Sequence, residues 1–237
     1  MFKEKIKITS IDVDNNLELK VSSLFKYMQI VASNHVDSLK AGHMDLIKHN
    51  MLWVVIRMDV KIYRTPILDE EVLFTTHPGE TKSFIFPRYF EMYDSKGKLI
   101  ISVSSLWTLI DKNTRRVVLK PEGFVKIKAE TNKDDLPQPE KITGDVLEMV
   151  DSHKVRYTEI DLNGHLNNTS YVEYILNTHD NEFYKHNRIS SININYDKEI
   201  KDTETVDLFS NKESPEIIKG RVNGENRFTA KIEYEKR

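Results

Sequence analysis

The stretch NTSYVEYILNTHDNEFYKHNRISSININY, residues 168–196, contains two successive patterns. Apolar side chains first recur at the spacing of a helix, and an apolar run typical of a β-strand follows. The repeat predicts an amphipathic helix from Asn168 to about Phe183. The members of its apolar stripe are Tyr171, Val172, Ile175 and Leu176. Strands are expected to follow at residues 189–196, 204–209, 216–222 and 228–235, with Asn223-Gly224 as the tight turn before the last of them.

The same order of elements precedes this stretch in the first half of the chain. An amphipathic helix is predicted at residues 22–39, where the segment Leu24–Met28 aligns with Tyr171–Ile175. Strands are expected at residues 53–63, 70–76, 83–93 and 98–110, with a turn at residues 94–97 before the last of them. We interpret the chain as a long internal repeat. Each copy is one helix followed by an antiparallel sheet, an α+β pattern.

A proline-containing, charged segment, residues 120–145, separates the two copies. Structureless stretches of this length are uncommon inside compact domains, so the segment is the natural linker. The predicted organisation is an N-terminal domain at residues 1–128, a linker at 129–146 and a C-terminal domain at 147–237.

The composition limits what the protein can do. Of its 237 residues, 39% are hydrophobic and 30% are charged, which is typical of a globular protein, and the net charge of −2 does not suggest a nucleic-acid partner. The chain has no cysteine, which excludes a disulfide framework and a thiolate nucleophile. No signal peptide or membrane span is recognisable, so a cytoplasmic location without membrane attachment is expected.

The polar segment DLNGHLNN, residues 161–168, leads directly into the second helix. If the segment is extended, Asp161, Asn163 and His165 share one face, while Leu162 and Leu166 lie against the core. The helix is expected to begin near Asn167 or Asn168, and its unpaired N–H groups could hold a developing oxyanion. The alternative is that these residues form only a turn and a helix cap.

Glu199 is the second candidate for chemistry, because it follows the apolar run of the strand at residues 189–196. The alternative is a solvated charge at a strand end. By sequence spacing, Pro66 stands at the corresponding place in the first copy and cannot act as a base, which favours chemistry in the C-terminal copy. The segment Asp12–Leu17 resembles the start of a calcium loop, but it lacks the glycine and the final glutamate. No metal site and no cofactor are predicted.

Four segments together resemble a known family, the acyl–acyl-carrier-protein (acyl-ACP) thioesterases of plant plastids and bacteria. MLWVVIRM at residues 51–58 is similar to the first-strand motif of that family, and SLWTLIDKNTRR at 105–116 is similar to its Trp-containing strand and following turn. Residues 161–171 match its D-x-N-x-H-x-N-N-x-x-Y segment, and residues 196–199 match its Tyr-x-x-Glu. The four matches occur in family order over nearly the whole chain.

The resemblance implies two hotdog folds in tandem, each a long helix wrapped by an antiparallel β-sheet. It implies an acyl-binding tunnel in the N-terminal hotdog and a catalytic site in the C-terminal one, formed by Asp161, Asn163, His165 and Glu199. Ile200 stands where the plant enzymes carry a cysteine, and Tyr174 stands where tryptophan is common. No plastid transit segment is recognisable, so a bacterial cytosolic member is expected.

The expected reaction is hydrolysis of fatty acyl-ACP in fatty acid biosynthesis, which releases the free fatty acid. The phosphopantetheine belongs to the substrate, and acyl carrier protein is the expected partner. Glu199 is expected to activate a water nucleophile and Asn163 to stabilise the oxyanion. His165 would position the water or protonate the thiolate, and Asp161 would orient Asn163 or His165. An acyl-CoA thioesterase, a non-catalytic acyl-thioester sensor and a dehydratase stay open as alternatives, and so does homodimer formation.

Overall fold

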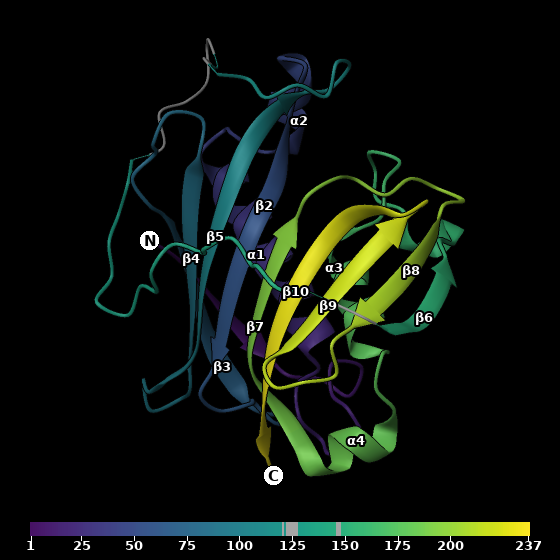
Figure 1. Cartoon of the computed structure of the whole chain (residues 1–237). Coiled ribbons are helices and arrows are strands. Elements are labelled where there is room, and N and C mark those ends of the chain that lie inside the picture. The colour runs from purple at the N-terminus through teal and green to yellow at the C-terminus, as the bar shows by residue number, and fades with distance from the viewer. Residues whose placement is uncertain (120, 122–127, 146–147) are drawn as a thin grey trace. The chain divides into compact units, whose positions relative to one another are not determined.

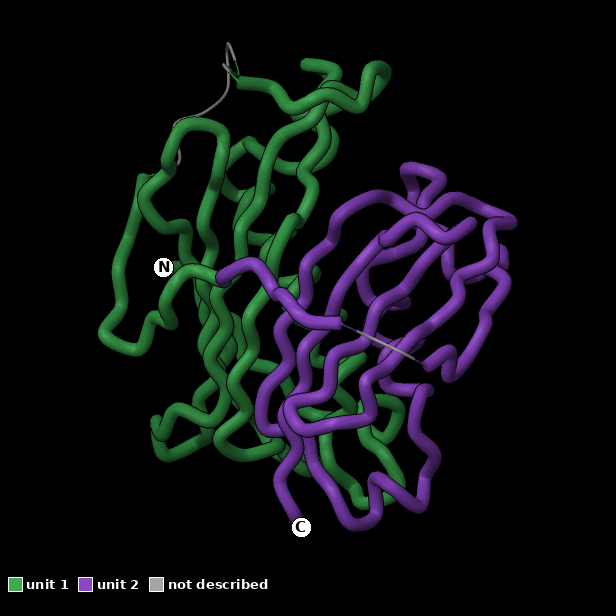
Figure 2. The backbone as a smooth tube through the Cα atoms, in the orientation of Figure 1, with its two compact units in different colours: residues 1–139 green, residues 140–237 purple. Residues whose placement is uncertain are grey.

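The computed structural model describes residues 1–119, 121, 128–145 and 148–237. They form two compact units, residues 1–139 (unit 1) and 140–237 (unit 2), which Figure 2 shows in green and purple. Residues 134 and 137 of the expected linker pack on the sheet of unit 1, because their carbonyl groups accept hydrogen bonds from Ser102 at 2.9 Å and Ser104 at 2.6 Å. The expected linker, 129–146, therefore divides between the units, and its residue 146 lies outside the described residues.

Unit 1 is a five-stranded antiparallel sheet with one long helix, α1 (Val21–Ser38), against one face (Figure 1). A short helix, α2 (His43–Lys48), follows α1. The strands, in their order across the sheet, are β1 (Phe2–Lys7), β3 (Glu71–Pro78), β4 (Phe86–Tyr93), β5 (Leu99–Asp111) and β2 (Met51–Ile62).

The apolar stripe of α1 accounts for its position on the sheet. Leu24, Phe25, Met28 and Val31 recur at helical spacing, and each is at most 3% exposed. Burying side chains of this size stabilises the fold by roughly 1.5–3 kcal/mol each, which is more than helix propensity supplies. The predicted helix at residues 22–39 is thus confirmed, because this stripe must be covered by the sheet.

Unit 2 repeats this plan with shorter helices, α3 (Asn168–Leu176) and α4 (Asn181–His186). The single helix expected from 168 to 183 is wrong in its length: it ends at Leu176, and the side chain of Asp180 caps a new helix by accepting the N–H of Phe183 at 2.9 Å. The strands, in their order across the sheet, are β7 (Asn187–Tyr196), β10 (Glu225–Lys236), β9 (Glu216–Val222), β8 (Thr205–Ser210) and β6 (Glu148–Lys154).

The core of unit 2 gives a stability prediction at Gly220 on β9. A Cβ atom there would stand 1.9 Å from a ring carbon of Phe228, a side chain with no exposed surface. We expect Gly220→Ala to lower the free energy of unfolding by about 1–3 kcal/mol, because overpacking forces a buried ring to move. Urea denaturation measures the loss. The double variant Gly220→Ala/Phe228→Leu should lose less stability through Gly220→Ala than the chain that keeps Phe228. If Gly220→Ala lowers the free energy of unfolding equally in both backgrounds, the proposed clash is contradicted.

Among the described residues, no helix combines the length and the apolar character that crossing a membrane would require.

Candidate active site

The predicted segment 161–168 forms a tight turn, and Asp161 holds it. The Oδ1 atom of Asp161 accepts the backbone N–H of Asn163 at 2.8 Å and that of His165 at 3.1 Å. The backbone of Asp161 closes the turn by donating to the carbonyl of His165 at 2.7 Å. Asp161 therefore holds the backbone of both residues, and its Oδ2 atom also accepts an N–H of the Asn163 side chain at 3.3 Å.

The expectation that this segment is extended is wrong, and Gly164 is the reason. Gly164 has a φ angle of +79°, a left-handed conformation that reverses the chain between Asp161 and His165. Of the two leucines expected against the core, Leu166 is 3% exposed, whereas Leu162 at the tip of the turn is 74% exposed. The alternation of an extended strand does not apply within a turn, so Leu162 faces solvent.

The second helix begins at Asn168 as expected, with Asn167 as its cap. The side chain of Asn167 accepts the N–H of Thr169 at 3.0 Å, and its carbonyl accepts that of Ser170 at 2.9 Å. Two of the first N–H groups of α3 are thus already bonded. The helix start therefore offers fewer donors to an oxyanion than expected, and the side chain of Asn163 becomes the more important one.

Glu199 lies beside this turn, although it is far away in the sequence. Its Oε2 atom lies 3.5 Å from Nε2 of His165, and the two side chains are 34% and 17% exposed. The backbone sets this contact, because the N–H of Leu166 donates to the carbonyl of Ile200 at 2.8 Å and residues 165 and 201 form an isolated β-bridge. The structure thus brings all four predicted residues together: Glu199 contacts His165, and Asp161 binds the backbone of Asn163 and His165.

Unit 1 contains a second copy of this turn at residues 14–19. The Oδ1 atom of Asp14 accepts the N–H of Asn16 at 2.8 Å and that of Glu18 at 3.1 Å, the two distances found around Asp161. Leu17 takes the left-handed conformation of Gly164, with φ at +60°. The segment that resembles the start of a calcium loop is therefore the structural counterpart of the turn that Asp161 holds.

This second copy lacks the groups proposed for chemistry. Glu18 stands at the place of His165. The N–H of Leu19 donates to the carbonyl of Pro66 at 2.8 Å, as Leu166 does to Ile200, so Pro66 corresponds to Ile200. The counterpart of Glu199 is Thr65, and the expected equivalence with Pro66 is wrong by one residue. The inference drawn from it still holds, because a threonine hydroxyl is not a general base either.

Glu159 anchors the start of the turn that Asp161 holds, and sequence analysis missed it. Its Oε2 atom accepts the hydroxyl of Tyr174 on α3 at 2.8 Å and the N–H of Arg156 at 2.7 Å, and His153 lies 3.0 Å from its Oε1 atom. These partners hold the pKa of Glu159 below its usual value, against the opposing effect of burial. Its backbone carbonyl accepts the N–H of the cap residue Asn167 at 2.8 Å.

The same anchor occurs in unit 1, where Asp12 accepts the hydroxyl of Tyr27 at 2.8 Å and its carbonyl accepts the N–H of Lys20 at 2.9 Å. The sequence does contain a signal for this anchor. In each half, an acidic residue stands two positions before the aspartate of the turn, and a tyrosine follows in the next helix. Since both units have the anchor and only unit 2 has the four predicted residues, we interpret Glu159 as a positioning residue.

We expect Glu159→Gln to lower kcat by up to ~10²-fold with KM little changed, because a small displacement of the turn moves the reacting groups. The matched control is Asp12→Asn, which removes the counterpart carboxylate of unit 1. Both variants should lose comparable stability in thermal unfolding, but only Glu159→Gln should lose turnover. A loss of turnover that is equal in the two variants would reduce Glu159 to a purely structural role.

A cavity of about 460 Å³ also lies in unit 2, but none of the four predicted residues lines it. Its walls include His179, Phe183, Glu216 and Tyr234. Nε2 of His179 lies 2.7 Å from Glu216, whose other carboxylate oxygen accepts the hydroxyl of Ser210 at 2.5 Å. These bonds satisfy the buried carboxylate locally, so we do not assign the thioester to this cavity.

Comparison with known proteins gives matches over both units. The N-terminal domain of the acyl-ACP thioesterases matches residues 1–127, and their C-terminal domain matches residues 146–236. The chain is 24% identical to oleoyl-acyl carrier protein thioesterase 2 of Arabidopsis thaliana, over 99% of this chain and 69% of that protein. It is 25% identical to dodecanoyl-[acyl-carrier-protein] hydrolase of Cinnamomum camphora, over 84% of this chain and 56% of that protein.

Two solved structures share the fold. An acyl-ACP thioesterase from Bacteroides thetaiotaomicron superposes with a TM-score of 0.85 at 24% identity, covering 98% of this chain and 97% of that one. The 12:0-ACP thioesterase from Umbellularia californica gives a TM-score of 0.86 at 20% identity, covering 100% and 97%. The expected α+β class with two hotdog units is confirmed. The chain belongs to the acyl-ACP thioesterase family, and its expected enzyme class, a thioester hydrolase, is confirmed with it.

Proposed function

We propose that this chain hydrolyses fatty acyl-ACP in unit 2, with Glu199 as the general base, and so releases the free fatty acid and ends chain elongation. The observation that carries the proposal is the contact between Glu199 and His165 beside the turn that Asp161 holds. Family membership supports the reaction, and this contact supports the assignment of residues.

Water is the proposed nucleophile, because the chain has no thiol and Glu199 is within reach of solvent. The carboxylate of Glu199 removes a proton from the water as its oxygen attacks the thioester carbon. A base of this kind contributes ~10²–10⁴-fold in rate. Nε2 of His165 lies 3.5 Å from Oε2 of this carboxylate and restrains its position.

The oxyanion that forms at the carbonyl oxygen is assigned to Asn163. The Nδ2 group of Asn163 carries two N–H bonds, and the contact with Oδ2 of Asp161 at 3.3 Å uses one of them. The other N–H can donate to the developing charge. Because Asp161 also holds the backbone of Asn163, this donor is oriented before substrate binds.

Collapse of the tetrahedral intermediate breaks the carbon–sulfur bond and leaves the phosphopantetheine thiolate, which needs a proton. Glu199 passes the proton that it took from water to Nε2 of neighbouring His165, and the imidazolium so formed protonates the sulfur, which returns both side chains to their starting states. The products are a fatty acid and the free thiol of the carrier, so no cofactor is consumed.

The proposal has four further parts. They are acyl carrier protein as the partner, an acyl-binding role for unit 1, a cytoplasmic location and homodimer formation. The family implies the acyl-ACP substrate.

The deciding experiment presents the purified chain with a mixed set of acyl-ACPs and, separately, with the same acyl groups on CoA. We expect free fatty acids, identified by mass spectrometry, from the carrier-bound set at much higher kcat/KM. Equal turnover on CoA would favour an acyl-CoA thioesterase. Tight acyl-thioester binding without released acid would contradict hydrolysis altogether.

A further inference from the structure

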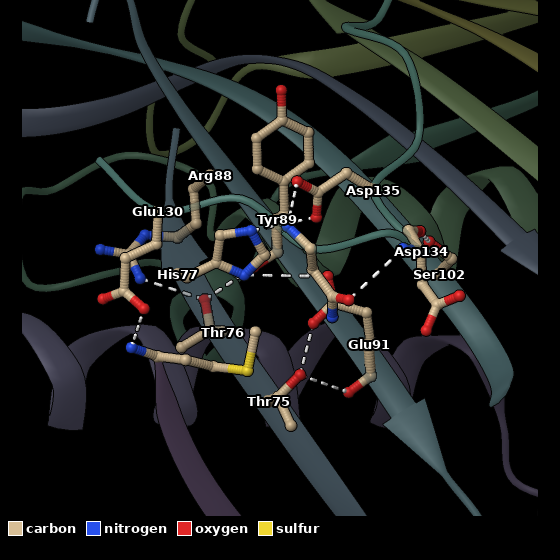
Figure 3. Close-up of polar contacts among 12 residues, drawn as sticks. Thr75, Thr76, His77, Arg88, Tyr89, Glu91, Ser102, Glu130, Asp134 and Asp135 are labelled. Carbon is tan, nitrogen blue, oxygen red and sulfur yellow. Dashed lines mark hydrogen bonds and ion pairs between the residues drawn. The ribbon is translucent and has the colours of Figure 1, made fainter. Parts of the chain in front are cut away.

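A cluster of three titratable side chains lies in unit 1 and contains none of the residues proposed for catalysis (Figure 3). His77 is on β3, Glu91 is on the neighbouring strand β4, and Asp135 comes from the segment that packs on the sheet after residue 127. One ligand atom from each residue can be chosen so that all three lie within 4.8 Å of one another. We propose that this cluster binds a divalent transition-metal ion.

The register of the sheet brings the first two residues together. Thr75 pairs with Glu91 and His77 pairs with Tyr89, so His77 and Glu91 are diagonal neighbours on one face of the sheet. The intervening Thr76 projects to the opposite face, where Arg88 donates to its hydroxyl at 3.1 Å and lies 3.2 Å from His35 of α1. The cluster is therefore on the face of the sheet that α1 does not cover, beneath residues 128–139.

The cluster is deeply buried, yet its polar atoms are poorly satisfied. The side chains of His77 and Glu91 have no exposed surface, and that of Asp135 is 17% exposed. Within the described part of the chain, both ring nitrogens of His77, Oε1 of Glu91 and Oδ1 of Asp135 make no hydrogen bond of acceptable geometry. Buried polar atoms normally have partners, so this group of four requires an explanation.

Other contacts hold each carboxylate in place and aim its second oxygen into the cluster. Glu91 accepts the hydroxyl of Thr75 with Oε2, which leaves Oε1 directed at His77. Asp135 accepts the N–H of Asn132 at 2.9 Å with Oδ2, which leaves Oδ1 3.0 Å from Nε2 of His77. Figure 3 shows the three side chains pointing toward one another. The donor set is thus oriented by contacts outside it, as metal ligands usually are.

The distance between His77 and Glu91 fits a shared cation better than a hydrogen bond. Oε1 of Glu91 lies 3.8 Å from Nδ1 of His77, which is too long for a hydrogen bond. Two ligands of one zinc ion stand ~3.3–4.2 Å apart, because each bond is ~2.1 Å long.

The charge of the cluster points in the same direction. Among the described residues, no lysine or arginine forms an ion pair with Glu91 or Asp135, so two carboxylates share one histidine. Burying carboxylates without a compensating charge is costly, and a divalent cation would neutralise both. One imidazole with two carboxylates suits Zn²⁺ or a neighbouring first-row ion better than Mg²⁺ or Ca²⁺, which prefer oxygen ligands. The bound ion would tie residues 128–139 to β3 and β4.

The test uses the full chain without an affinity tag, treated with chelator and then dialysed against Zn²⁺. We expect about one tightly held zinc per chain by elemental mass spectrometry and a higher melting temperature with zinc than with chelator. Asp135→Asn should weaken zinc binding at least ~10-fold by calorimetry. The matched control is Asp134→Asn, because Asp134 accepts the hydroxyl of Tyr93 at 3.0 Å instead and should bind zinc as the wild type does.

His77→Gln should abolish the binding, and circular dichroism shows whether that variant folds. If it does not fold, Asp135→Asn decides, because this side chain is at the partly exposed edge of the cluster. No zinc uptake by the wild type, or equal uptake by Asp135→Asn and Asp134→Asn, would overturn the proposal. Stability that responds to pH but not to zinc would mean that the cluster shares a proton instead.

Discussion

Glu199→Gln is expected to lower kcat for acyl-ACP hydrolysis by ~10²–10⁴-fold, because the amide cannot take a proton from water. The substitution keeps the size of the side chain, so KM should change little. The acidic limb of the pH–rate profile, which reports protonation of the base, should disappear in the variant. Stopped assays of released fatty acid at several pH values measure both effects.

The matched control for Glu199→Gln is Asp202→Asn, which removes an exposed carboxylate from the same loop. It should leave turnover and its pH dependence unchanged. Folding of Glu199→Gln is not in question, because unit 1 forms the same turn with Thr65 at the corresponding place. A variant that keeps most of the wild-type rate would remove Glu199 from the role of base.

Asn163→Ala is expected to lower kcat by ~10²–10³-fold, the usual loss when one oxyanion donor is removed. The turn itself should survive, since it is the backbone N–H of residue 163 that binds Asp161 at 2.8 Å. KM should stay close to the wild-type value, because the lost hydrogen bond strengthens only as negative charge develops. Steady-state kinetics on one acyl-ACP separate the two constants.

Asn16→Ala is the matched control for Asn163→Ala, since the side chain of Asn16 donates to Oδ2 of Asp14 at 3.3 Å, as Asn163 does to Asp161. It should cost a similar, small amount of stability and leave kcat unchanged. If both alanine variants lose activity equally, or if only KM rises in Asn163→Ala, the oxyanion role belongs to another donor.

The elements with strong apolar periodicity could be predicted from the sequence, and those without it could not. The strand at residues 216–222 matches β9, in which five of the seven residues are buried. The strands β1 and β6 were missed. In β1 only Ile6 is buried and in β6 no side chain is, since each is an edge strand with one neighbour. Backbone pairing forms such strands with little apolar signal.

The four catalytic candidates could be named from the sequence, but the shape of the turn that carries three of them could not. Alternation along a strand predicted that Leu162 faces the core, whereas a left-handed Gly164 turns it to solvent. A glycine permits this conformation without requiring it, so the choice depends on the bonds to Asp161. The cluster around His77 has no spacing motif at all, because strand register and a distant segment bring its members together.

The turn held by an aspartate occurs in both units, so the residues that determine its shape can be distinguished from those proposed for its reactivity. Its shape is encoded by the aspartate, a left-handed residue and the helix start, while reactivity is encoded by positions that the shape does not use. The side chains proposed for catalysis could therefore be introduced into the corresponding turn of unit 1. A redesign with Glu18→His and Thr65→Glu would give unit 1 the same imidazole and carboxylate on an existing scaffold, so this protein is a natural host for engineering a second hydrolytic centre.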